Sequence, residues 1–391
     1  MSGVEVGSVY VHAPFCARRC FYCDFAVTVD REPDPEPWLR AIERELQALE
    51  AEGLVRLAPR LETLYVGGGT PSLLRPEAME ELGRLLTGGP GSGDRLSMPG
   101  LEWTAEANPE SLTPSVAAGW RRAGVNRVSL GTQSFQEPVL RWMGRLHGPH
   151  GTAAAVAVAR DAGFETYSVD LIFGLPAAVE RDWSADLDAA LALEPPHVSL
   201  YGLTADTGTP LGRAVGEGRI RMVEEARYDE EYLEAAERLA AEGYEHYEVS
   251  NFARPGHRSR HNQAYWSGVP YLGLGNGAHS FVPPTRRWNV REWADYACLT
   301  GGPSLPVDES ETVEGASRRL EDAWLGLRCD RGLPVRWSRE GSAGHLVATW
   351  EESGWAEVRA GRLTLTPRGW LLLDRLAIEL HEALERESRR G

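Results

Sequence analysis

Short apolar runs recur along the first half of the chain, and amphipathic stretches lie between them. The runs are rich in β-branched and aromatic residues, which is typical of strands, whereas stretches such as 37–52 and 178–193 repeat apolar residues at helical spacing. The predicted strands are residues 8–12, 61–66, 101–107, 127–131, 166–173 and 197–203. This alternation predicts an α/β fold of βαβ units around a mainly parallel sheet, either doubly wound or closed into a full or partial barrel.

The pattern changes after a Gly- and Pro-rich stretch at 301–306. Helical patterns at 314–327 and 345–353 are followed by two short β-like runs within 355–365 and by an amphipathic helix at 368–384. We therefore expect residues 1–300 to form the larger domain, with an extension that begins at 205, and residues 301–391 to form a small winged-helix-like α+β domain.

Charge and composition narrow the possible partners. The formal net charge of −16 disfavours a nucleic-acid partner, and acidic side chains also dominate the winged-helix-like module. Every cationic side chain is arginine, so Schiff-base and lysine general-base mechanisms are excluded. The sequence shows neither an apolar run of the roughly 20 residues that span a bilayer nor a signal-peptide pattern at its start. We expect a cytoplasmic protein whose membrane contact is at most peripheral.

Three cysteines, Cys16, Cys20 and Cys23, are clustered near the start of the chain, whereas Cys298 and Cys329 are isolated. This usage does not resemble a disulfide framework and fits reduced thiols that bind metal. Three thiolates on a four-iron cluster would leave one iron open for chemistry. The alternative is a zinc site in which His12 completes a Cys3His set. Neighbouring aromatic rings are expected to wall a cluster off from water: Phe15, Phe21, Tyr22 and Phe25.

Other unusual residues also follow the ends of predicted strands. They are the glycines of 67–69 with Thr70, then Glu106, Gln133 and Asp170. Because parallel strands place their carboxyl ends at one edge, we expect these residues and the cysteines to share one rim.

The Cys-x3-Cys-x2-Cys loop, with the Gly-Gly-Gly-Thr-Pro-Ser run at 67–72, resembles the radical S-adenosylmethionine (SAM) superfamily. Further motifs at 106–109, 131–135, 144–147, 170–176 and 261–266 resemble the branch that contains HemW-type heme chaperones and the oxygen-independent coproporphyrinogen III oxidase HemN. The resemblance covers nearly the whole chain. It implies a partial parallel (β/α)6 barrel.

The resemblance also implies cofactors and their ligands. Cys16, Cys20 and Cys23 would bind three irons of a [4Fe-4S] cluster, SAM would chelate the fourth iron, and an electron donor would reduce the cluster. The residues implied to contact SAM are Tyr10, Tyr22, Gly68, Gly69, Thr70 and Glu106. The residues that match a second SAM site of the oxidase are Gln133, Arg145, Asp170 and Gly202.

Two functions within this branch stay open at the level of sequence. The oxidase branch resembles a Cys-x3-Cys-x2-Cys-x-Cys pattern, and Phe25 stands at the place of its last cysteine. The segments 247–253, 261–266 and 273–280 are similar to HemW. Small departures from the family occur at Ser259, where a cysteine is common, and at Asn276, where a small residue is usual. We interpret the chain as a heme chaperone that binds heme and transfers it to an acceptor protein. The alternative is an enzyme, an oxidase that decarboxylates coproporphyrinogen III to protoporphyrinogen IX with SAM.

A heme chaperone needs an axial ligand for iron, and histidine is the common one. His261 is the first choice because Tyr265 and Trp266 lie beside it and their rings could stack on a macrocycle. The other histidines compared are His147, His150, His197, His246, His257 and His279.

Overall fold

The computed structural model describes residues 3–87 and 100–388. The chain forms two compact units, which are described separately. The barrel unit comprises Met1–Glu224 and Pro270–Thr312, and the second unit comprises Glu225–Val269 and Val313–Gly391. The chain thus passes between the units three times, whereas the sequence suggested one boundary near residue 301.

The main sheet of the barrel unit has the strand order β10-β9-β8-β7-β6-β2-β13-β14-β15-β16. Its strands are β2 (Ser8–Ala13), β6 (Thr63–Gly68), β7 (Glu102–Ala107), β8 (Arg127–Gln133), β9 (Thr166–Phe173), β10 (His197–Gly202), β13 (Tyr271–Leu274), β14 (His279–Val282), β15 (Thr285–Asn289) and β16 (Val307–Thr312). Two small parallel pairs join β1 (Val4–Val6) to β5 (Val55–Leu57) and β3 (Phe15–Cys16) to β4 (Thr28–Val29).

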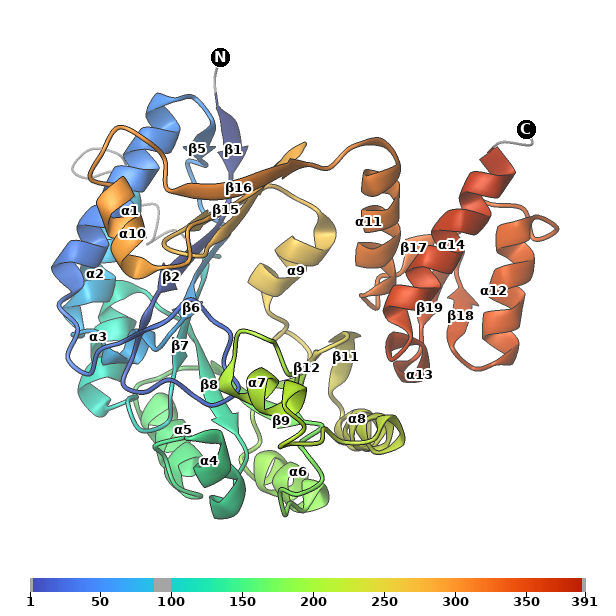
Figure 1. Ribbon diagram of the computed structural model, residues 1–391, viewed down its shortest axis with the longest axis horizontal. Helices are drawn as coiled ribbons and strands as arrows, with labels where there is room; N and C mark the ends of the chain where they lie inside the picture. Colours follow the sequence, from blue (N-terminus) through green and yellow to red (C-terminus); the bar gives the residue numbers. More distant parts are fainter. Residues whose placement is uncertain (1–2, 88–99, 389–391) are drawn as a thin grey trace. The chain divides into compact units, whose positions relative to one another are not determined.

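Helices alternate with the parallel strands. They are α1 (Pro35–Ala51), η1 (Pro71–Leu73), α2 (Glu77–Thr87), α3 (Pro114–Ala123), α4 (Glu137–Met143), α5 (Gly151–Asp161), α6 (Trp183–Ala192), α7 (Pro210–Gly216) and α10 (Trp293–Leu299). Figure 1 shows α1, α2, α3 and α5 following one another around the outside of the strands.

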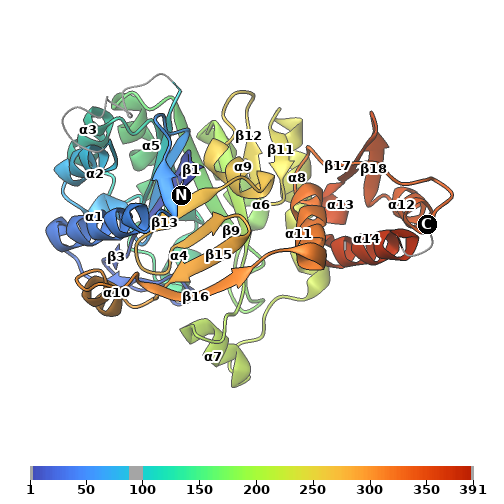
Figure 2. The same ribbon diagram turned by 90° about the horizontal axis from the view of Figure 1, so that it is seen from above.

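Six parallel strands, β2 and β6 to β10, form the expected partial (β/α)6 barrel, so the predicted fold class is confirmed. The sheet then continues past β2: β13 pairs parallel to it, and β14 to β16 add an antiparallel extension. The orange ribbons of β15 and β16 lie side by side in Figure 2.

The six predicted strands are all present, with ends that move by one or two residues. The helix expected at 178–193 begins later, at Trp183, because Asp182 is its N-cap and accepts a hydrogen bond from the Ala185 amide. Asp34 caps α1 in the same way, through the Glu36 amide.

The second unit contains α8 (Glu225–Ala241), β11 (Glu245–Glu248), β12 (Asn251–Ala253), α9 (Arg260–Ser267), α11 (Gly315–Leu327), β17 (Leu333–Pro334), α12 (Ser342–Glu352), β18 (Ala356–Arg359), β19 (Arg362–Leu365), α13 (Pro367–Trp370) and α14 (Leu373–Ser388). The expected order of helix, helix, hairpin and helix is present. The long helix predicted at 368–384 is two helices instead: Thr366 caps a first short helix that ends at Trp370, and α14 starts at Leu373.

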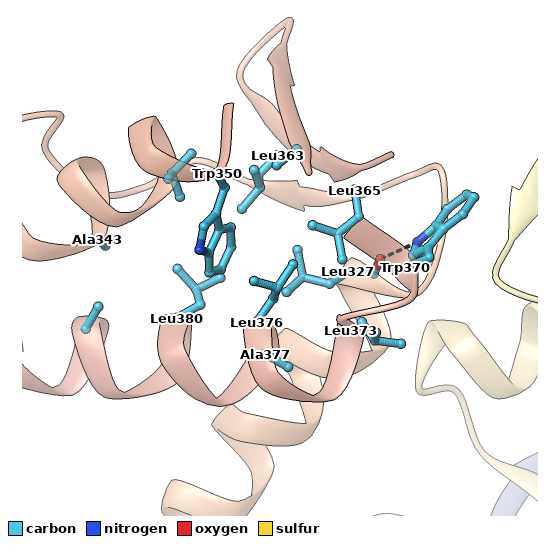
Figure 3. Close-up of a cluster of buried hydrophobic side chains, with 13 residues drawn as sticks. Leu327, Ala343, Trp350, Leu363, Leu365, Trp370, Leu373, Leu376, Ala377 and Leu380 are labelled. Atoms are coloured by element: carbon cyan, nitrogen blue, oxygen red, sulfur yellow. Dashed lines mark hydrogen bonds between the residues drawn. The ribbon is translucent and has the colours of Figure 1, made fainter. Parts of the chain in front are cut away.

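The second unit has its own hydrophobic core, in which α14 contributes Leu373, Leu376, Ala377 and Leu380 (Figure 3). These side chains pack against Trp350 of α12 and the leucines of β19. The Trp370 indole donates a hydrogen bond to the Leu327 carbonyl at 2.9 Å, so α13 is tied to the end of α11. Burial of one face of α14 therefore holds this unit together.

Within residues 3–87 and 100–388, no helix is both long enough and apolar enough to cross a membrane.

Truncation of the α14 core should destabilise the protein. Leu376 is fully buried, so Leu376→Ala is expected to lower the free energy of unfolding by about 2–5 kcal/mol through lost apolar contact and a residual cavity. Urea denaturation followed by tryptophan fluorescence would measure the change. The matched control is Ile378→Ala on the same helix, whose side chain is 50% exposed and should cost about 0.5 kcal/mol or less.

Candidate functional site

A cavity of about 370 Å³ lies at the carboxyl ends of the parallel strands in the barrel unit. Its lining includes most of the residues that the sequence singled out: Cys16, Cys20, Tyr22, Cys23, Gly68, Gly69, Thr70, Glu106, Gln133, Arg145, Asp170 and Gly202. Twelve predicted side chains and glycines from separate strands and loops therefore share one rim, as expected for a parallel sheet.

The cysteine loop follows β2 and begins on β3, and its thiols are partly buried. Burial raises the pKa of the Cys16 thiol to about 11, against a hydrogen bond from Thr70, whose Oγ1 lies 3.5 Å from Cys16 Sγ. Burial also raises the pKa of Cys23. Arg145 Nη1 donates to Cys20 Sγ at 3.8 Å. Without a metal, Cys16 and Cys23 are therefore neutral thiols at physiological pH.

His12 lies behind this loop, and both of its ring nitrogens are engaged. Nδ1 is 2.9 Å from the Tyr10 hydroxyl, and Nε2 is 3.0 Å from the Ala26 carbonyl. Burial lowers the pKa of His12 to about 4, so the ring is neutral, donates from Nε2 and accepts at Nδ1. Among the described residues, no group of three or more His, Cys, Asp or Glu side chains is arranged around one metal ion. Because both nitrogens of His12 already have partners, the ring would have to give up a hydrogen bond to complete a Cys3His zinc site.

The glycine run at 67–69 brings backbone close to the cysteine loop. Gly69 donates its amide to the Ala13 carbonyl at 2.8 Å, and a Cβ on Gly69 would lie 2.6 Å from that carbonyl oxygen. Gly68 has φ of +102°, and a Cβ there would lie 2.1 Å from the His12 ring. Only glycine fits at these two positions, because a side chain would collide with the His12 ring at Gly68 and with the backbone of residues 13–15 at Gly69.

Glu106 stands at the end of β7 with two hydrogen bonds in place. Tyr65 Oη donates to Glu106 Oε1 at 2.8 Å, and the Gly68 amide donates to Oε2 at 2.9 Å. Burial nevertheless raises the pKa of Glu106 to about 7, because desolvation outweighs these two donors. The carboxyl group is therefore poised to accept hydrogen bonds from a ligand when it ionises near neutral pH.

Arg145 and Gln133 line the cavity, and each has a buried polar atom without a partner among the described residues. Arg145 Nη2 donates to Asn108 Oδ1 and to the Gly131 carbonyl, each at 2.5 Å, but its buried Nε has no partner among the described residues. Gln133 Oε1 is also buried without a partner in that part of the chain, and Gln133 has φ of +65°, which is unusual for a residue with a side chain. One buried donor and one buried acceptor at this rim therefore have unsatisfied hydrogen-bonding capacity.

Two further charges complete the electrostatics of the rim. Burial lowers the pKa of Arg145, but the nearby Tyr22, Cys20 and Glu110 outweigh burial and raise it overall. Burial raises the pKa of Asp170, whose oxygens accept from Ser168 Oγ at 2.6 Å and Ser129 Oγ at 2.7 Å. The site therefore holds a buried cation, Arg145, and a buried carboxyl group, Asp170, whose pKa burial raises.

The donor set fits an iron–sulfur cluster and a small polar ligand. Three cysteines from one loop face the same cavity as a glycine run that admits close backbone approach. The unpartnered Arg145 Nε and Gln133 Oε1 suit a carboxylate and a hydrogen-bond donor, respectively. Soft thiolate ligands favour iron–sulfur chemistry over hard cations.

Three predictions from the sequence fare differently. Tyr10 does not line the cavity; its ring stacks on Tyr65 at 6.0 Å, and Tyr65 is the ring that faces the cavity. His261 lies on α9, which belongs to the second unit. Phe25 does not wall the cysteine loop off from water, because its side chain is 60% exposed.

Some lining residues were not predicted: Tyr65, Asn108, Ser129 and Tyr201. Asn108 lies inside the motif at 106–109, so the sequence motif already pointed to this part of the site. Tyr65 and Ser129 lie within their strands, and alternation along a strand shows which residues share a face but not which face lines a cavity.

Comparisons with known proteins agree with this geometry. The family model of the Radical SAM superfamily matches residues 10–190 of this chain. A heme chaperone HemW from Mycobacterium tuberculosis is 38% identical over 379 residues, covering 96% of this chain and 94% of that protein. The heme chaperone HemW of Bacillus subtilis is 33% identical over 327 residues, covering 83% and 84%. Coproporphyrinogen III oxidase (HemN) from Escherichia coli, a radical SAM enzyme, has a similar fold with a TM-score of 0.76 at 22% identity, covering 97% and 90%.

The raised pKa of Glu106 predicts a pH-dependent effect on stability in the metal-free and ligand-free protein. A carboxyl group whose pKa is raised by folding stabilises the fold at low pH, and that contribution is lost as the pH rises through the folded value of about 7. Glu106→Gln should therefore gain roughly 1–3 kcal/mol relative to the unmodified protein between about pH 5 and about pH 8.

Urea denaturation at several pH values would measure this gain. Glu43→Gln, on the exposed face of α1, is the control and should show no such trend. A constant difference between Glu106→Gln and the unmodified protein at every pH would contradict the raised pKa.

Proposed function

The chain belongs to the HemW family of the radical SAM superfamily, and on this premise we propose that it is a heme chaperone that binds heme and passes it to an acceptor protein. The observation that carries the proposal is the likeness to HemW proteins over nearly the whole chain, at up to 38% identity. Phe25 in place of a further cysteine agrees with it. Heme, an acceptor protein and an electron donor are the partners that this function requires.

In this proposal the barrel unit holds a [4Fe-4S] cluster and SAM. When bound, the reduced cluster supplies the electron that cleaves the sulfonium C–S bond of SAM. Cys16, Cys20 and Cys23 would bind three irons, and protons leave the thiols on binding, because metal ligation requires thiolates. The pKa of Cys16, which burial raises to about 11, makes this proton release substantial.

The same residues would orient SAM. Gly68 and Gly69 leave room for backbone groups to approach the ligand, and ionised Glu106 would accept from ribose hydroxyls or from the amino group. Arg145 Nε would donate to a carboxylate, and Gln133 Oε1 would accept from a ligand donor. These roles follow from the unused or ionisable atoms that line the cavity.

We propose His261 as the axial ligand of heme iron, and this role requires a local rearrangement around the buried ring. The side chain is 1% exposed, and its Nε2 is 3.0 Å from the Tyr265 hydroxyl. Burial lowers the pKa of His261 to about 3, so the ring is neutral, which is the form that ligates iron. Ligation through Nε2 requires the Tyr265 bond to be released and the ring to become accessible.

Anaerobic reconstitution with SAM, a reductant and coproporphyrinogen III tests the proposed function. We expect the protein to hold its cluster and to bind SAM and heme without stoichiometric formation of protoporphyrinogen IX. The assay follows protoporphyrinogen alongside methionine and 5′-deoxyadenosine, and Cys20→Ala supplies the baseline without a complete set of cluster ligands. Stoichiometric decarboxylation would instead assign the oxidase activity and sink the chaperone proposal.

Heme titration of matched variants tests His261. His261→Ala should lower heme affinity by roughly tenfold or more, because the axial ligand is lost. Tyr265→Phe should retain or strengthen binding, because it removes the hydroxyl that occupies Nε2. His345→Ala, an exposed histidine on α12 of the same unit, is the control. Equal affinity for all four proteins, followed through the Soret band, would exclude His261 as the ligand.

A further inference from the structure

The segment 24–26, directly after the last cysteine of the cluster loop, is held by side chains from distant parts of the barrel unit. The Ala26 carbonyl accepts two hydrogen bonds, from His12 Nε2 at 3.0 Å and from Asn276 Nδ2 at 2.9 Å. Arg291 Nη2 donates to the Asp24 carbonyl, and it lies 3.3 Å from Asp24 Oδ1. Residues 250 or more positions away in sequence thus fix the backbone beside Cys23.

Asn276 is the central residue of this contact. It is 1% exposed, and its amide nitrogen donates to the Ala26 carbonyl and to the Arg291 carbonyl, the latter at 2.8 Å. Both partners are acceptors, so only the NH₂ end of the side chain satisfies them. A small apolar residue such as alanine could form neither bond.

Buried hydrogen bonds to Glu45 hold the turn that carries Asn276 in place. Glu45 of α1 is buried and accepts from the Gly275 amide at 2.9 Å, from Asn289 Nδ2 at 2.6 Å and from Tyr296 Oη at 2.6 Å. These three donors surround one carboxyl group and tie the turn to α1, to β15 and to α10. Motion of the turn would break several buried hydrogen bonds together.

The packing around Asn276 is also tight. Gly277, the next residue, has φ of +67°, and a Cβ there would lie 2.8 Å from the Ala26 Cβ. On the other side of the cysteine loop, the Trp293 ring packs edge-on against Phe15 at 5.7 Å. The turn between β13 and β14 therefore contacts the end of the cysteine loop after Cys23, and the start of α10 contacts the residue before Cys16.

We propose that Asn276, supported by Arg291, is a positioning residue for the cluster: it holds segment 24–26 so that the Cys23 thiolate stays in place. The inference rests on the proposed function only in taking Cys23 as a cluster ligand. Loss of the two bonds from Asn276 frees the backbone that follows Cys23, so this thiolate leaves iron more often and the cluster is lost sooner. The unfolding of the protein as a whole changes much less than cluster retention does.

Cluster loss from the holoprotein is the first test. Asn276→Ala should accelerate the decay of the iron–sulfur absorbance in the presence of an iron chelator by roughly five- to tenfold, the change expected when about one net hydrogen bond is lost. Arg291→Ala should act in the same direction but less, because its side chain is 54% exposed and the variant leaves the buried network intact. Unchanged decay in both variants would overturn the proposal.

Thiol reactivity in the cluster-free protein is the second test and does not depend on iron. Iodoacetamide should modify Cys23 several-fold faster in Asn276→Ala than in the unmodified protein, while the exposed Cys298 serves as an internal reference of constant rate. Asn276→Asp should match or exceed this effect, because a carboxylate oxygen would face the two carbonyls instead of a donor. An unchanged ratio of Cys23 to Cys298 modification would refute the positioning role.

The control is Asn126→Ala, which removes another bridging asparagine of the same unit. Asn126 donates to the Leu101 carbonyl at 2.7 Å and accepts from the Trp103 amide at 2.9 Å, at the starts of β7 and β8. It should change the urea midpoint without changing Cys23 reactivity. If the unmodified protein holds no cluster, the proposed function fails; if it holds a cluster that all variants retain equally, only the role of Asn276 fails.

Discussion

The parallel pairing of β2 with a strand on each side is the constraint on which the site depends. β6 pairs with β2 so that His12 lies opposite Gly67 and Ala13 opposite Gly68, and β13 pairs with its other edge. Because this register is fixed by buried backbone hydrogen bonds, the cysteine loop and the glycine run leave the sheet side by side. A shift by one residue would turn every β2 side chain to the opposite face and separate the two loops.

Burial affects the pKa values of the site residues as well as the packing of the fold. The cavity takes a carboxyl group and two thiols out of water, and it thereby raises the pKa values of Glu106, Cys16 and Cys23. Glu106 then titrates near neutral pH, and the two thiols stay protonated in the absence of a metal ion. Arg145 is the exception, since its neighbours keep it charged against burial. The groups are therefore already in position, whereas their charges would change when cofactors bind.

Local pattern was enough to predict the alternating strands and the cysteine loop, because apolar period and thiol spacing are properties of short segments. It does not show which side-chain partners the fold supplies. His12 was weighed as a metal ligand, yet Tyr10 and Ala26 occupy its nitrogens. Tyr10 was expected at the ligand, yet it stacks on Tyr65. The contact between Asn276 and Ala26 joins residues 250 positions apart, which no spacing rule along the chain can reach.

The division of the chain into two units places the proposed heme ligand and the proposed cluster ligands in different units. The cysteines, Glu106 and Arg145 belong to the barrel unit, whereas His261 belongs to the second unit, which buries a core of its own around α14. Because each core is internal to its unit, a substitution at His261 acts first on the second unit and one at Cys20 acts first on the barrel. Under the proposed function, substitutions at His261 and Cys20 would therefore test heme binding and cluster binding separately. A chaperone that needs the cluster only to regulate heme release would then differ from an oxidase, in which loss of the cluster abolishes all turnover.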